Sequence, residues 1–120
     1  MIKFTIQGCL PTLNEYTLAN RKNKFAGSKM KKDADDLISY YIKAQVTETI
    51  NKEFIVAIDW YEKDRRTDAD NICHGVKYIL DSLQQCGVIP NDNRKYINEL
   101  HHTVHVDKEN PRIEVQLIER

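Results

Sequence analysis

The sequence predicts a single domain of the α/β (α+β) class, in which two helices pack on a mixed sheet in the order β-α-β-α-β-β. Three observations lead to this prediction. The chain has 120 residues, the size of one domain. Four short segments alternate apolar and polar residues, whereas two longer ones repeat apolar residues at helical spacing. No repeat, linker or low-complexity segment interrupts residues 1–120, so we expect one domain over that range.

The first half of the chain is expected to contain two strands, a loop and a helix. Residues 2–7 alternate apolar and polar side chains, as a half-buried strand does. Residues 8–29 have no periodicity and are predicted to form a long basic loop. Residues 30–50 carry apolar residues on one helical face, and residues 53–61 alternate again as a second strand.

The second half is expected to contain one helix and a β-hairpin. Helical spacing runs from Asp70 to Cys86, and Gly87 is a plausible helix stop. Residues 95–106 are typical of a strand, residues 107–111 of a hairpin turn, and residues 113–117 of a last strand. Parallel and antiparallel pairing together are expected in such a sheet.

Composition excludes several classes of protein. Apolar runs are too short to span a membrane, and the N-terminus is typical of a strand rather than a signal peptide, so a cytoplasmic protein is expected. Cys9, Cys73 and Cys86 are odd in number and form no CxxC pair, which favours reduced thiols. The histidines at positions 101, 102 and 105 lack a short Cys/His ligand pair, so packing or surface roles are favoured over zinc binding.

An acidic motif is the most informative part of the chain. Asp68, Asp70 and Asn71 directly precede the second helical pattern, and Asp92 follows just after that helix should end. The fold can therefore bring the three carboxylates together. Converging carboxylates repel one another unless a cation lies between them. Oxygen ligands without a thiolate predict Mg²⁺, with Mn²⁺ as the alternative, rather than zinc.

Four polar residues are expected to share one face of this helix: Asp70, His74, Lys77 and Asp81. Lys77 would stand two turns, about 10 Å, from Asp70 and reach toward a phosphate held at the helix start. The alternative is a capping aspartate followed by an ordinary charged solvent face. A cap needs one carboxylate, however, and this motif supplies a pair and a third residue further along the chain.

Basic residues accompany the acidic motif although the formal net charge is zero, with 18 basic and 18 acidic residues. Residues 21–32 contain six cations and no acid, and Phe25 among them could stack on a base. The alternative is a solvated loop. Arg65 and Arg66 lie just before the aspartates and could hold a polyanion there. The expected phosphate contacts are Arg21, Lys22, Lys24, Lys29, Arg65 and Arg66.

These residues resemble the RusA-type Holliday junction resolvases. The resemblance lies in Pro11 with Asn14, in Asp68-Ala-Asp-Asn, in Leu80-Asp-Ser-Leu and in Gly87-Val-Ile-Pro-Asn-Asp, and it covers nearly the whole chain. It implies that Asp68, Asp70 and Asp92 bind the divalent metal. The family lysine falls on Lys77 when counted back from Leu80, but on His74 when counted forward from Asp70. Asn14 and His74 are included among the expected DNA contacts.

The resemblance also implies a homodimer that acts on four-way junction DNA, with one active site on each of two strands. The function expected is a Mg²⁺-dependent, structure-selective endonuclease that resolves junctions by paired nicks in recombination and repair. Three alternatives stay open: a prophage junction-binding protein without catalysis, a Mg²⁺ phosphodiesterase acting on other branched nucleic acids, and a zinc-dependent interaction module.

Overall fold

A four-stranded sheet forms one layer of the protein, and the computed structural model describes all of residues 1–120. The strands lie in the order β1 (Ile2–Gln7), β4 (Arg112–Glu119), β2 (Phe54–Glu62) and β3 (Ile97–Val106). β4 runs antiparallel to both β1 and β2, whereas β3 runs parallel to β2. The mixed sheet and the α+β class predicted from the alternation are therefore confirmed.

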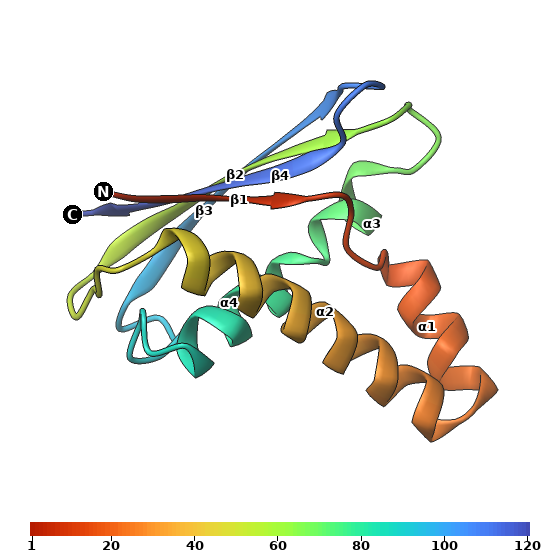
Figure 1. Cartoon of the computed structure of the whole chain (residues 1–120), viewed down its shortest axis with the longest axis horizontal. Helices are drawn as coiled ribbons and strands as arrows, with labels where there is room; N and C mark the ends of the chain where they lie inside the picture. The colour runs from red at the N-terminus through yellow and green to blue at the C-terminus, as the bar shows by residue number, and fades with distance from the viewer.

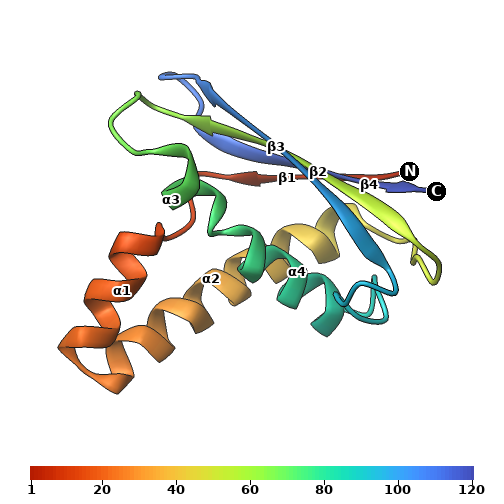
Figure 2. The same ribbon diagram turned by 180° about the vertical axis from the view of Figure 1, so that it is seen from behind.

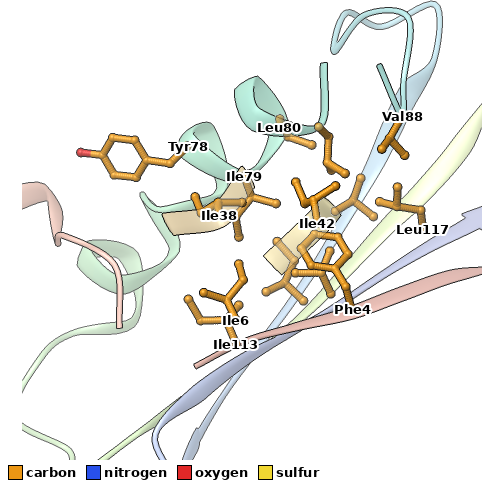
Figure 3. Packing of buried hydrophobic residues seen from close by; sticks show 14 of the residues in the cluster. Phe4, Ile6, Ile38, Ile42, Tyr78, Ile79, Leu80, Val88, Ile113 and Leu117 are labelled. Carbon is orange, nitrogen blue, oxygen red and sulfur yellow. The ribbon is translucent and has the colours of Figure 1, made fainter. Parts of the chain in front are cut away.

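The helices cover a single face of this sheet (Figures 1 and 2). The long helix α2 (Lys24–Gln45) packs against β1 and against α4 (Val76–Gln85). Alternate residues of β2 from Phe54 to Trp60 are buried beneath them. One continuous cluster of 23 buried apolar residues fills the space between the layers, and Figure 3 shows its centre. The hydroxyl of Tyr78 points away from that cluster.

The opposite face of the sheet is polar and carries its own contacts. The Arg112 guanidinium lies 3.8 Å from the centroid of the Tyr61 ring. Tyr61 in turn stacks on His105 with 4.5 Å between centroids, and His105 Nε2 lies 2.8 Å from Asp59 Oδ1. Contacts between side chains of neighbouring strands thus stabilise this face, which no helix covers.

The predicted loop over residues 8–29 is wrong. Residues Leu13–Lys22 form helix α1, and α2 starts at Lys24, before the predicted start at residue 30. A capping box explains where α1 begins: Thr12 Oγ1 accepts from the Glu15 backbone N–H, and the Glu15 carboxylate accepts from the Thr12 N–H. No residue of α1 is buried, so the helix has no apolar stripe for a periodicity search to find.

The two predicted helices also differ in extent from the structure. α2 ends at Gln45 rather than residue 50, although Ile50 is still buried and donates its N–H to the Val88 carbonyl. The helix predicted from Asp70 to Cys86 is interrupted, and its first part is the short α3 (Ala69–Cys73). Gly75 lies at the interruption, where a Cβ atom would come within 3.0 Å of the Trp60 ring. None of the helices is both long and apolar enough to cross a bilayer.

Candidate functional site

Asp68 lies at the start of α3, on the wall of an open polar cavity of about 700 Å³. The cavity is formed by the segment that joins β2 to α3 and by the end of β3, and Arg65 and His105 also line it. Asp68 occupies the N-cap position, yet its side chain makes no capping hydrogen bond. Its exposed carboxylate is therefore not used to stabilise the helix.

Asp70 lies in the first turn of α3 and is exposed. Its Oδ1 accepts a hydrogen bond from the Asn71 backbone N–H at 3.0 Å, a contact with its own neighbour only. A carboxylate in the first turn is favourable because the helix N-terminus carries partial positive charge. The other oxygen of Asp70 forms no hydrogen bond or ion pair within the chain.

Asp92 lies beyond α4 and is joined to that helix by Lys77. The Lys77 Nζ lies 3.4 Å from Asp92 Oδ2 and 3.1 Å from Asp81 Oδ1. The hydrogen bond to Asp81, together with the charge of Asp92, raises the pKa of Lys77 above its usual value. A lysine charged at all physiological pH values is thus held against one of the three predicted aspartates.

The same ion pairs continue from α4 into α2. The second oxygen of Asp81 lies 3.4 Å from the Lys31 Nζ, which also contacts Asp35 Oδ2 at 2.9 Å. Together these contacts form an ion-pair network of five residues: Asp35, Lys31, Asp81, Lys77 and Asp92. Asp35 and Asp81 are largely buried, with 14% and 20% of their side chains exposed. Positive and negative groups alternate along this ion-pair network. Electrostatic attraction therefore links α2, α4 and the segment that carries Asp92.

His74 is not on the polar face predicted for it. Its ring packs between Tyr16 and Tyr78, with centroid separations of 5.7 and 5.5 Å. The His74 Nε2 atom is buried and has no hydrogen-bond partner. The structure therefore places the His74 ring in an aromatic packing environment, and its expected contact with DNA stays a prediction. Its position follows from the interruption before α4, which breaks the face that Asp70, His74, Lys77 and Asp81 would share on one straight helix.

The three aspartates do not assemble into a metal site in this arrangement. No group of three or more His, Cys, Asp or Glu side chains converges closely enough to hold an ion. Mg²⁺ commonly takes only one or two protein carboxylates and completes its shell with waters and substrate phosphate. The donor chemistry of Asp68, Asp70 and Asp92 suits such an ion, whereas the geometry leaves the site incomplete in the free protein.

The predicted basic residues differ in whether they form ion pairs. Arg21, Lys22 and Lys24 are exposed at the turn between α1 and α2, and none of them forms an ion pair. Lys29 instead pairs with Asp33 one helical turn away, at 2.8 Å. Asn14 is exposed in the first turn of α1, and Arg66 is exposed beside Asp64 at 3.7 Å. A second, mainly apolar cleft of about 510 Å³ contains none of these residues except Lys29.

Two histidines of β3 and Cys9 each form a contact with another side chain. His101 contacts Glu99, and His102 Nδ1 accepts a hydrogen bond from the Trp60 indole N–H at 3.0 Å. Burial, with a hydrogen bond to Glu62, raises the pKa of Cys9 to about 11. This thiol is protonated at neutral pH, so it is not a nucleophile.

Sequence reasoning missed two features of the site. Asp81 and Lys31 were not predicted to contact each other, because they are 50 positions apart and only the packing of α2 on α4 joins them. His105 was treated as a surface or packing residue, yet it lines the same cavity as Asp68. Local spacing carries no signal for either contact.

Comparison with known proteins adds one finding. A family model described as "Endodeoxyribonuclease RusA" matches residues 8–118. No curated protein matches the chain.

Proposed function

The chain belongs to the RusA endodeoxyribonuclease family, and from this premise we propose that it is a Mg²⁺-dependent enzyme that resolves four-way DNA junctions by paired nicks. The biological setting proposed is recombination and DNA repair in the cytoplasm. The observation that carries the proposal is the pairing of Lys77 with Asp92, since it places a fixed cation beside an acidic residue of the motif. Phosphodiester cleavage requires stabilisation of charge that develops on phosphate oxygens.

The three aspartates are proposed to hold the metal once DNA supplies phosphate oxygens. Asp68 and Asp70 are exposed on α3, and neither is committed to a long-range contact. A bound Mg²⁺ would polarise the scissile phosphate and favour attack by water. Asp92 would have to exchange part of its contact with Lys77 for the ion, which is a small change because their separation is already 3.4 Å.

Lys77 is proposed to stabilise the phosphate charge directly. An ammonium group has three hydrogen-bond donors, and the two carboxylates that face Lys77 leave at least one donor for a phosphate oxygen. The side chain is 63% exposed, so DNA can reach it. His74 has no such access through its buried Nε2, which favours Lys77 for the role of the family lysine.

The remaining basic residues are proposed to bind the DNA backbone. Arg65 lies in the cavity beside Asp68, and Arg66 is 89% exposed next to it in sequence. Such phosphate contacts position the substrate and carry little sequence information. A homodimer is proposed because two copies related by a two-fold axis match the symmetry of a four-way junction and place one site on each of two strands.

The test is cleavage of a synthetic four-way junction beside a linear duplex, with Mg²⁺ or EDTA. Symmetric nicks in the junction alone, lost in EDTA and in Asp70→Asn, are expected. Asparagine can still accept from the Asn71 N–H, so Asp70→Asn should remain folded. Asp36→Asn is the matched control, since it removes the same charge from an exposed pair with Lys32.

Two outcomes would contradict the proposal. Equal cutting of linear duplex would reject junction selectivity, and near wild-type cleavage by folded Asp70→Asn would reject the acidic site. Junction binding that is indifferent to Mg²⁺ and unaccompanied by cleavage would support the non-catalytic alternative instead.

A further inference from the structure

The helices α1 and α2 form a hairpin that projects from the body of the protein (Figures 1 and 2). The two helices are joined through one residue, Asn23, which ends α1 and begins α2. Its backbone N–H donates to the Ala19 carbonyl at 3.3 Å, and its side-chain oxygen accepts from the Ala26 N–H at 2.8 Å. The turn is thus closed by hydrogen bonds on both sides, and the tip of the hairpin is a defined structure rather than a loose loop.

An aromatic side chain stands at this tip without any covering. Phe25 is 85% exposed, the highest value among the large apolar side chains, and Leu18 on α1 is 63% exposed. An exposed phenylalanine forgoes the stabilisation that burial of its ring would bring. Neither α1 nor α2 covers the Phe25 ring. Leu18, another exposed apolar side chain of the hairpin, does not cover it either. The ring is therefore available to a partner.

The charge around Phe25 indicates the chemistry of that partner. Arg21, Lys22 and Lys24 are exposed and form no ion pairs, and residues 16–32 contain no acid. The first turn of α2 also has none, although carboxylates stabilise that position in helices. By contrast, Lys29, Lys31 and Lys32 are each paired with an aspartate one turn away. The cations at the tip are thus left unpaired, whereas the next three lysines of α2 are neutralised.

We propose that the hairpin tip is a DNA-binding wedge, in which Phe25 stacks on a base exposed at the branch point and the three cations bind the flanking phosphates. The inference rests on the proposed function, since it assumes a branched DNA substrate. Aromatic rings flanked by cations are the common means of holding unpaired bases, because every base has a face to stack on. A second copy of the chain is a poorer partner for the tip, because two such tips in two-fold contact would bring six like charges together.

The test compares binding of junction and linear duplex in EDTA, where cleavage does not occur. Phe25→Ala should weaken junction binding by roughly 5- to 100-fold, the effect of losing one base–aromatic stack, and leave duplex binding unchanged. Phe25→Trp should retain junction affinity. Leu18→Ala is the control, since it removes an exposed apolar side chain from the same hairpin without removing a ring. Lys22→Ala should weaken both DNA forms and reduce the dependence of binding on salt.

The outcomes separate this inference from the proposed function. Failure of the wild-type chain to prefer the junction would overturn the proposed function and, with it, the wedge. Normal junction preference in both wild type and Phe25→Ala would overturn the wedge alone. Sedimentation should give the same mass for Phe25→Ala as for wild type, whereas a fall in mass would assign the tip to contact between copies of the chain and overturn the proposal.

Discussion

Substitution of Gly75 tests how closely the junction between α3 and α4 packs against Trp60. A Cβ atom at this position would lie 3.0 and 3.1 Å from Cη2 and Cζ3 of Trp60, and 3.3 Å from Cδ1 of Leu10. Trp60 is only 1% exposed and its indole N–H is bonded to His102, so the ring has little freedom to move. Overpacking of this kind costs about 1–3 kcal/mol.

The cost of Gly75→Ala is partly offset because alanine reduces the conformational freedom of the unfolded state. The backbone of Gly75 is already in the right-handed helical region, with φ −59° and ψ −15°. Alanine there restricts the unfolded state and contributes about 0.4–1 kcal/mol of stability. The overpacking term is the larger, so the net expectation is a loss of about 0–2.6 kcal/mol in the free energy of unfolding. At roughly 4 °C per kcal/mol, Tm should fall by up to about 10 °C.

Urea denaturation of Gly75→Ala and Gly27→Ala, beside wild type, measures this effect. A Cβ at Gly27 would meet only the side chain of Asn20, which is exposed and can turn toward solvent. Gly27 lies inside α2, where alanine is favoured by up to about 1 kcal/mol, so this variant should match or exceed wild-type stability. Clearly greater stability of Gly75→Ala than wild type would refute the argument that the Trp60 ring leaves too little space for a Cβ atom at this position.

The remaining predictions concern the lysine and a histidine of β3. Asp81→Asn should slow single-turnover junction cleavage by about 10- to 100-fold with little change in junction affinity, because Lys77 loses the partner that positions it. In the Lys77→Met background the same change should have no further effect, and a further loss there would reject action through Lys77. Burial lowers the pKa of His102, so its contribution to stability is present above about pH 6.5 and is lost as the pH falls from there through the folded value. Urea denaturation from pH 7 to 5 should therefore show a smaller loss for His102→Gln, whose side-chain oxygen can still accept from Trp60; an unchanged slope would contradict this assignment.

The strands and the buried faces of the helices were predictable because burial leaves a period in the sequence. The alternation in residues 2–7 and 53–61 corresponds to β1 and β2, with shifts of one residue at most at each end. The helix α1 was missed because none of its residues is fully buried, and its capping box at Thr12 is the local signal that marks it. The interruption at Gly75 was missed because the apolar pattern continues across it, and the contact of this position with Trp60, 15 positions earlier in the chain, is seen only in the fold.

For the site, the sequence by itself determined the kinds of groups available: three carboxylates of a recognisable motif, a nearby lysine and several basic residues ahead of them. The tertiary structure alone decided which groups meet. Lys77 on α4 faces Asp92, while the His74 ring lies between Tyr16 and Tyr78. Side-chain identity is local information, but contacts between elements depend on packing that no spacing along the chain encodes.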